Sequence, residues 1–354
     1  MNLSSKASNV LLARCRARYG MRLTAQDIDA LLGCRTVADC AACLRNTRYA
    51  PALSSLGESS MYRRPSEAAL NGFLLDELYT LCRCEQSVGD WFSDYIIMQA
   101  EIRLITSFVQ KLSAGRQQEM ILNVPEFILH RSGIDPELLG AARSYDDFLG
   151  AVKRSRFAKI LRALRPLPGN RPDCALIEHS LYVKFYDEVI ALVNRHSGSA
   201  KEELLDIIGT RIDISNFRHI YRLKKYYGAD IAAVRSMLIH HEHRISSSVM
   251  RSMTNAVSAD EVLRIFLEKT PYGRKVDADR LRADAGLETE TQLLIHTRAR
   301  KLMRSSVNPS TVLLAYITLA EAEVHDLTTI IEGVFYGLSR DEITGLITID
   351  DLAV

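Results

Sequence analysis

The densest cluster of metal-ligand side chains in the chain is the run His240-His241-Glu242-His243. If this run were helical, His240 and His243 would share a face and could bind a divalent metal together. The spacing is not that of the His-Glu-x-x-His hydrolases, in which the two histidines stand farther apart. The run also separates two repeated segments of the chain, a position typical of an exposed linker. We therefore expect no metal here, although a metal-dependent enzyme stays a distant alternative.

Paired carboxylates are the second feature that could do chemistry, because a general acid and a general base are often both carboxyl groups. Three pairs fall at an expected helix start or at solvated ends: Asp146/Asp147, Glu202/Glu203 and Asp350/Asp351. The near pair Glu321 and Glu323 differs, since Glu101 and Asp213 occupy positions equivalent to Glu323 at intervals of about 110 residues. A reaction needs its acid once, at one site. An acid that recurs three times favours a structural role or a quasi-symmetric interface.

The patterns that usually carry phosphate or acyl chemistry are missing. The chain has neither a Gly-rich phosphate loop nor a Gly-x-Ser-x-Gly elbow. Its net charge of +2 gives no field that would draw nucleic acid or anionic lipid. The sequence therefore predicts no ATPase or hydrolase activity, no cofactor and no nucleic-acid partner.

The cysteines and the apolar runs indicate the compartment. Seven cysteines are an odd number, and Cys40 and Cys43 fall where the other two repeats carry plain apolar residues. We interpret both as small core side chains rather than metal or redox ligands, in a reducing compartment. No apolar run reaches the length of a membrane helix, and the N-terminal apolar stretch is too short for a secretory leader.

The elements that must position these side chains recur three times along the chain. Each repeat opens with a helix N-cap residue followed three positions later by an acid: Thr36/Asp39, Ser144/Asp147 and Ser258/Glu261. The segments that follow close at Thr47-Arg48-Tyr49, Ser155-Arg156-Phe157 and Lys269-Thr270-Pro271-Tyr272. The common period of about 110 residues makes each repeat a small domain rather than one layer of a solenoid.

Within each repeat the pattern predicts a helical hairpin, a polar loop and a long helix. Short helices are expected before the three caps, over residues 26–32, 136–142 and 248–254. Loops rich in Gly, Pro, Ser and Asp are expected over residues 54–65, 165–172 and 273–286. The long helices carry apolar stripes at alternating steps of four and three, starting at Met98, Thr210 and Ala320. A glycine that suits a left-handed helix end follows each stripe, at Gly115, Gly228 and Gly337.

The fold class that follows is all-α, because strand-like alternation is almost absent and Gly and Pro number only 18 and 9. We predict three similar helical-bundle domains, over residues 1–120, 121–235 and 236–354.

The second halves of repeats two and three resemble a known family. Asp213-Ile214-Ser215-Asn216, followed by Arg222 and Lys224, resembles the Asp-x-x-Asn…Arg-x-Lys helix of the C subunits of V-type and A-type ATP synthases. The eukaryotic relatives in this family are the d subunits of V-ATPases. The run from Ala315-Tyr316 through Glu321 and Glu323 to Gly337-Leu338-Ser339 is similar to the closing helix of that family. The opening Ala13-Arg14-Cys15-Arg16 also matches its early Ala-Arg-x-Arg pattern, so the resemblance covers nearly the whole chain.

Two departures from the family pattern are visible. The Asn expected three residues after the acidic position is Leu104 in repeat one and Asp326 in repeat three. The aromatic-rich signatures of the eukaryotic d subunits are not evident, which favours a bacterial or archaeal rotary ATPase.

The resemblance implies a pseudo-threefold, funnel-like arrangement of the three domains and no catalytic residues. It implies a central-stalk protein that acts as a socket, coupling the central shaft to the membrane rotor ring for proton or sodium transport. The partners would be the shaft and rotor-ring subunits, with this chain a monomer within a hetero-oligomer, cytoplasmic and peripheral to the membrane. A helical scaffold or regulatory adaptor outside ion transport stays the alternative.

Six residues are the candidates for a partner interface or for a role that defines the repeats: Glu101, Asp213, Asn216, Arg222, Glu321 and Glu323. The three equivalent acids either line a common lumen or cap neighbouring helices within each domain.

Overall fold

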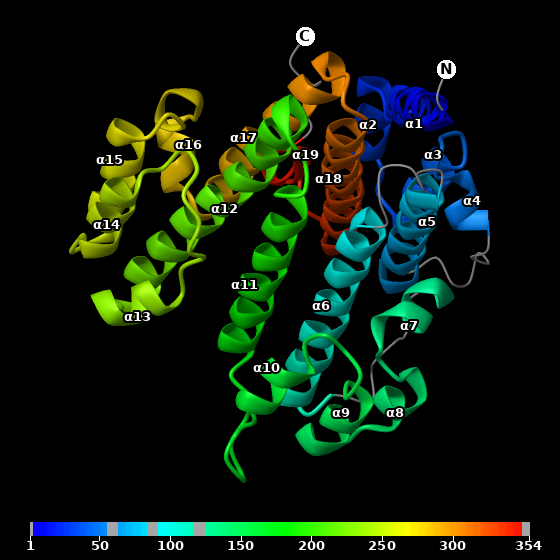
Figure 1. Ribbon diagram of the computed structural model, residues 1–354. Coiled ribbons are helices and arrows are strands. Elements are labelled where there is room, and N and C mark those ends of the chain that lie inside the picture. Colours follow the sequence, from blue (N-terminus) through cyan, green and yellow to red (C-terminus); the bar gives the residue numbers. More distant parts are fainter. Residues whose placement is uncertain (1–2, 55–62, 84–90, 117–124, 349–354) are drawn as a thin grey trace. The chain divides into compact units, whose positions relative to one another are not determined.

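The computed structural model of the chain describes residues 3–54, 63–83, 91–116 and 125–348 (Figure 1). Helices and their connections make up this part of the chain, and no strand occurs in it, so the all-α prediction is confirmed. Among these residues no helix combines the length and the apolar character needed to cross a membrane.

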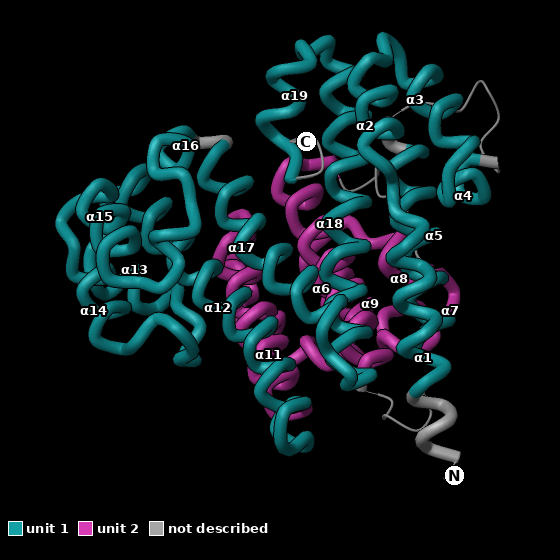
Figure 2. The backbone as a smooth tube through the Cα atoms, turned by 90° about the horizontal axis from the view of Figure 1, so that it is seen from above, with its two compact units in different colours: residues 1–88, 193–354 teal, residues 89–192 magenta. Residues whose placement is uncertain are grey.

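The chain divides into two compact units, residues 89–192 and residues 1–88 with 193–354 (Figure 2). We call them the insert unit and the main unit. The described part of the insert unit holds six helices: α6 (Trp91–Ser113), α7 (Glu126–Ser132), α8 (Pro136–Ala141), α9 (Tyr145–Ala151), α10 (Ala158–Ala163) and α11 (Cys174–Val193). The last residue of α11 lies just beyond the border of the unit. The three-domain division at residues 120 and 235 stays a prediction.

The first and last parts of the chain contribute together to the main unit. Its N-terminal helices are α1 (Leu3–Gly20), α2 (Ala25–Leu32), α3 (Val37–Leu44), α4 (Ala50–Ser54) and α5 (Arg63–Arg83). The segment after the insert unit forms α12 (Gly198–Tyr227), α13 (Ile231–Ser236), α14 (Ser247–Asn255), α15 (Ala259–Lys269), the short 3₁₀ turn η3 (Gly273–Lys275) and α16 (Ala278–Arg282). The C-terminal helices are α17 (Asp284–Ser305), α18 (Pro309–Tyr336) and α19 (Arg340–Leu346).

Helix α18 is the central element of the main unit. It begins with Pro309, whose fixed φ suits the first helical position, and it packs against α1, α5, α12, α17 and α19. Its stripe from Ala320 to Val334 is buried, as predicted. Helix α12 packs in turn against α15 and α17, with Phe217 stacked on Phe266 at 3.7 Å between ring centroids.

The predicted caps and helix ends are confirmed. The side chains of Thr36, Ser144 and Ser258 each accept the backbone N–H of the acid three residues on. The preceding helices of the hairpins are α2, α8 and α14, within a residue or so of the expected bounds. The three glycines that follow the long helices all have positive φ, at 70° for Gly115, 54° for Gly228 and 71° for Gly337.

One expectation about local structure is wrong. Residues 278–282 form α16 inside the predicted 273–286 loop, because Asp277 caps this turn with its carboxylate. Residues 237–246 are not helical, which fits the linker expected between repeats two and three, so His240 and His243 do not share a helix face. The predicted 54–65 loop lies mostly outside the described residues.

Candidate functional site

The segment that closes each repeated hairpin has the same local geometry three times. The hydroxyl groups of Thr47, Ser155 and Thr270 each accept the N–H of the aromatic residue two positions on, at 3.2–3.3 Å. This turn orients Tyr49, Phe157 and Tyr272 after the second hairpin helix. We call Glu101, Asp213 and Glu323 the repeat carboxylates, and these turns are their neighbours in the fold.

Asp213, on α12, is fully buried and accepts three hydrogen bonds at one oxygen, Oδ2. The hydroxyl of Tyr272 donates at 2.9 Å, and the backbone N–H groups of Arg244 and Ile245 donate at 2.9 and 3.1 Å. Ile245 immediately precedes Ser246, the N-cap of α14. Burial raises the pKa of Asp213, and the three donors oppose this rise. The carboxylate therefore ties α12 to the start of the hairpin formed by α14 and α15.

Glu323, on α18, repeats this arrangement with the first hairpin of the chain. Tyr49 donates its hydroxyl to Oε1, and the N–H of Leu23 donates to Oε2 at 3.1 Å. Leu23 immediately precedes Thr24, the N-cap of α2. Burial raises the pKa of Glu323, and the Tyr49 hydroxyl and the charge of Arg48 oppose the rise. A residue near the C-terminal end of the chain thus fixes a hairpin near its beginning.

Glu101, on α6 of the insert unit, sits in a poorer environment. The aromatic at the equivalent turn is Phe157, which has no hydroxyl to donate. Within the described part of the chain neither Glu101 oxygen accepts a hydrogen bond, and Nε of Arg156 lies 3.5 Å from Oε2. Burial raises the pKa of Glu101 to about 8, with Arg156 opposing the rise and Glu188 and Asp94 adding to it.

Asn216 and Asp326 fill one role in two helices, α12 and α18. The Asn216 amide donates to the carbonyl of Ile239 at 2.9 Å and accepts the N–H of Ile239 at 2.8 Å. Asp326 accepts the N–H of Thr348 at 3.0 Å and the Thr348 hydroxyl at 2.8 Å. Each residue clamps the segment that returns after the short helix beyond the terminal glycine. The departure from Asn to Asp at position 326 therefore keeps the clamp.

The two remaining candidates are ion-pairing residues between long helices. Arg222 on α12 binds Glu288 on α17 at 2.7 Å, and its side chain is 47% exposed. Glu321 on α18 lies 3.4 Å from Arg211 on α12. Asp213 and Asn216 therefore both bind the stretch of chain between α13 and α14, whereas Arg222 and Glu321 face other helices.

His243 is the member of the histidine run that contacts a buried carboxylate. His243 lies 3.2 Å from Asp206, which Arg244 and Arg298 also bind. Burial alone raises the pKa of Asp206, but the hydrogen bonds from His243 and Arg244 and the charge of Arg298 lower it to about 2. The described residues contain no group of three His, Cys, Asp or Glu side chains arranged to hold a metal.

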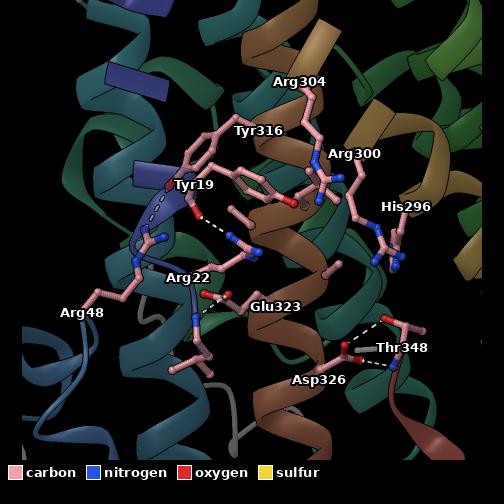
Figure 3. A pocket seen from close by; sticks show the side chains of 14 residues that line it. Tyr19, Arg22, Arg48, His296, Arg300, Arg304, Tyr316, Glu323, Asp326 and Thr348 are labelled. Carbon is pink, nitrogen blue, oxygen red and sulfur yellow. Dashed lines mark hydrogen bonds between the residues drawn. The ribbon is translucent and has the colours of Figure 1, made fainter. Parts of the chain in front are cut away.

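An open pocket in the main unit lies next to Glu323 (Figure 3). Helices α1, α17 and α18 contribute most of its lining, and Asp326 and Thr348 close one side. The sequence pattern indicated neither this pocket nor the donor role of Tyr49 and Tyr272. Both tyrosines stand in the repeated segments that close the hairpins. The carboxylates that accept their hydrogen bonds lie 274 positions away for Tyr49 and 59 positions away for Tyr272.

The arrangement as a whole is that of a structural protein. Buried carboxylates bind backbone N–H groups and tyrosines at hairpin starts, and an amide and a carboxylate clamp returning segments. The candidate residues within the described part of the chain take part in packing contacts between helices, and these contacts leave no acid, base and nucleophile constellation among them.

Comparison with known proteins agrees with this assignment. Residues 11–346 match the family described as ATP synthase (C/AC39) subunit. The chain is 24% identical over 326 residues to the C subunit of the A-type ATP synthase of Pyrococcus furiosus, a match that covers 90% of this chain and 84% of the relative. The chain belongs to the ATP synthase (C/AC39) subunit family. Members of this family are a non-catalytic part of the rotary ATPase, which confirms the expectation of a protein without its own catalytic site.

Proposed function

We propose that this chain is the socket of a rotary A/V-type ATP synthase, holding the central shaft on one side and the membrane rotor ring on the other. In this role it transmits rotation between nucleotide chemistry and the transport of protons or sodium ions. Three helical domains in a pseudo-threefold, funnel-like arrangement would surround the shaft. The chain would act in the cytoplasm, peripheral to the membrane, as one copy within a hetero-oligomer.

The observation that carries the proposal is the family match over residues 11–346, which spans all three repeats. The recurring anchors add a physical reason. A socket that transmits torque has to resist shear between its helices, and buried hydrogen-bonded groups hold neighbouring elements in one geometry. Asp213 and Glu323 each fix a long helix to the start of a hairpin, in addition to the apolar packing of the same helices.

Reconstitution with the shaft and rotor-ring subunits of the same organism tests the proposal. The purified chain is mixed with each set separately and then with both, and complexes are measured by size-exclusion chromatography with light scattering. We expect a complex with the shaft, a complex with the ring, and a ternary complex that contains one copy of this chain. A chain that binds neither set would instead be a scaffold or adaptor outside ion transport, and the proposal would be wrong.

A matched pair of variants shows whether binding to the partner subunits requires the native fold. Asp213→Lys places a positive charge against two backbone donors and should disrupt the α12 anchor. Asp260→Lys makes the same charge change at an exposed position in the first turn of α15. We expect the first variant to lose the ternary complex together with its fold and the second to retain both.

A further inference from the structure

One stretch of the insert unit concentrates positive charge. Residues 148–172 contain seven Lys and Arg side chains and no Asp or Glu, in a chain whose net charge is only +2. The stretch covers the second half of α9, the turn to α10, α10 itself and most of the loop to α11. The small net charge of the whole chain therefore hides a local excess, which can attract an anionic partner.

Most of these cations are exposed and have no partner inside the protein. Two of the seven are neutralised, because Arg156 lies between carboxylates of α6 and α11 and Arg165 binds Asp146. The other five are exposed, and within the described part of the chain their side chains make no hydrogen bond, ion pair or ring contact: Lys153, Arg154, Lys159, Arg162 and Arg171. The charge of these five side chains is therefore available to a partner.

The fold of the insert unit does not require these charges. On α10, Leu161 is buried, whereas Lys159 and Arg162 lie three residues apart on the exposed side. The equivalent helix of the first repeat is α4, which follows Tyr49 as α10 follows Phe157, and α4 carries no Lys or Arg. Because α4 forms without cations, helix formation and packing do not explain the cations of α10.

The loop between α10 and α11 adds an apolar side chain to the same stretch. Leu167, which lies between Arg165 and Arg171 in the sequence, is 73% exposed. The N–H of Asn170 donates to the Leu167 carbonyl at 2.9 Å and closes a tight turn. The second position of this turn is a proline, and the third is a glycine with a φ of 84°, as in a type II turn. Figure 1 shows the loop extending beyond the ends of both helices, so the turn holds the leucine in solvent.

We propose that this basic surface, made of the five unpaired cations and Leu167, binds an anionic lipid bilayer. Each Lys or Arg near such a bilayer is attracted by the negative surface potential and strengthens binding by about fivefold. The exposed leucine enters the boundary between the headgroups and the acyl chains, where apolar side chains of peripheral proteins are buried. The turn fixes the leucine before binding, which lowers the entropy cost of insertion.

The leucine favours a lipid surface over nucleic acid. A phosphate backbone attracts the cations alone, whereas a bilayer presents negative headgroups directly above an apolar layer. The cations also belong to a turn, a helix and a loop, an arrangement that suits a continuous surface of mobile headgroups. Lipid binding is separate from the socket role, which requires only protein partners.

The experiment measures sedimentation of the full chain with lipid vesicles, without partner subunits. One set of vesicles is phosphatidylcholine alone, and the other is an equal mixture of phosphatidylcholine and phosphatidylserine. Two variants divide the surface into its charged and its apolar part. The double variant Lys159→Gln with Arg162→Gln removes charge from α10, and Leu167→Ser removes the apolar side chain from the loop.

Matched controls make the same changes elsewhere on the protein. Arg274→Gln with Lys275→Gln removes two exposed cations from η3, the segment that follows the equivalent turn of the third repeat. Val307→Ser removes an apolar side chain that is 78% exposed. Circular dichroism of every variant ensures that a loss of binding is not a loss of fold, and all substituted positions are exposed.

We expect saturable binding to the vesicles that contain phosphatidylserine, little binding to phosphatidylcholine alone, and weaker binding at higher salt. The α10 double variant should weaken binding about tenfold or more, and Leu167→Ser about threefold or more. Both controls should bind as the unmodified chain does.

Three results would overturn the proposal. The first is no binding to the vesicles that contain phosphatidylserine, and the second is equal weakening by the matched controls. The third is weakening by the α10 double variant but not by Leu167→Ser, because the surface would then attract any polyanion, nucleic acid included. Since no partner subunit is present, failure here leaves the socket proposal untouched.

Discussion

The hydroxyl of Tyr272 donates a 2.9 Å hydrogen bond to Oδ2 of Asp213, joining the end of one hairpin to the middle of α12. Tyr49 and Glu323 make the same bond between the first hairpin and α18. In the insert unit the tyrosine is replaced by Phe157, and the carboxylate of Glu101 has an arginine nearby instead of a hydroxyl. The acidic position of the repeat therefore has two kinds of partner: a tyrosine hydroxyl for Asp213 and Glu323, and a nearby arginine for Glu101.

Tyr272→Phe should destabilise the main unit by about 1–3 kcal/mol, the usual cost of removing a hydrogen bond to a buried charged group. The aromatic ring would stay stacked on Phe266, so the change isolates the hydroxyl. Urea unfolding followed by circular dichroism measures the effect. Tyr227→Phe, at a position 78% exposed, is the control and should change nothing. Equal stability of the two variants would contradict the anchoring role of the bond.

The insert unit should lose stability as the pH rises. The folded-state pKa of Glu101 is about 8, whereas an ordinary glutamate has a pKa of 4.5. Between these values the folded state binds more protons than the unfolded state, so the free energy of unfolding falls with rising pH. The slope reaches at most about 1.4 kcal/mol per pH unit. The stability that protonated Glu101 contributes is fully present below about pH 4.5 and is lost as the pH rises through about 8.

Glu101→Gln tests this dependence, because the amide keeps the shape and cannot ionise. We expect the variant to gain stability over the unmodified chain at pH 9, while the two converge near pH 5. Glu137→Gln, at an exposed position on α8, serves as control and should keep the original pH profile. A parallel pH profile for Glu101→Gln would show that Glu101 is ionised in the folded state without cost.

Exchange between Asn and Asp should destabilise the protein more at position 216 on α12 than at position 326 on α18. Asn216 faces one donor and one acceptor of Ile239, whereas Asp326 faces two donors of Thr348. Asn216→Asp would set a carboxylate oxygen against the Ile239 carbonyl, at a cost of about 1–3 kcal/mol. Asp326→Asn can still use the Thr348 hydroxyl, which also accepts, and should cost less. Thermal unfolding of both variants measures the order, and the reverse order would contradict this account.

The local features of the repeats were readable from the sequence because they depend on neighbours in the chain. The cap at Thr36 needs only the N–H three residues on, and Gly337 ends α18 through its own positive φ. The buried stripe of α18 follows from apolar spacing within one helix. These properties are fixed within a few residues, so a single sequence is enough to predict them.

The partners of the repeat carboxylates were not readable, because they come from another part of the chain. Nothing at Glu323 indicates that Tyr49 will donate to it, although the period of the repeats marks both. The role of His243 was hidden for the same reason, since it depends on Asp206 and on the absence of a side chain at Gly209. Contacts of this kind are decided by tertiary packing.

Gly209→Ala should disturb the Asp206 cluster. A Cβ at position 209 would lie 2.3 Å from Cγ of His243, so the imidazole would have to move away from Asp206. We expect a loss of about 1–3 kcal/mol, typical of an overpacked interior. Gly345→Ala, in α19 with open space around it, should be neutral or slightly stabilising. Denaturant unfolding distinguishes the two, and a Gly209→Ala variant as stable as Gly345→Ala would sink this interpretation.

The last prediction separates the two roles open to the repeat carboxylates, a lumen that contacts the shaft or anchors inside each hairpin. Glu101 and Asp213 are at most 1% exposed, and Asp213 and Glu323 bind internal donors, so we expect no direct contact with a partner. The isosteric variants Glu101→Gln, Asp213→Asn and Glu323→Gln remove the charge and keep most of the packing. Each should retain shaft binding in proportion to its folded fraction, as measured by size-exclusion chromatography and circular dichroism on the same sample.

Charge reversal at the same three positions is the complementary test, because it is expected to destroy the fold that the isosteric variants keep. A lysine at position 101, 213 or 323 would bury a cation, at 213 and 323 against N–H donors, which costs several kcal/mol and should unfold the hairpin concerned. Under the anchoring role, shaft binding is therefore lost only together with the fold. A reversed or isosteric variant that is folded by circular dichroism, yet no longer binds the shaft, would instead place the carboxylates on the partner-facing surface. The isosteric set decides between these results, because it separates the charge from the stability that the charge supports.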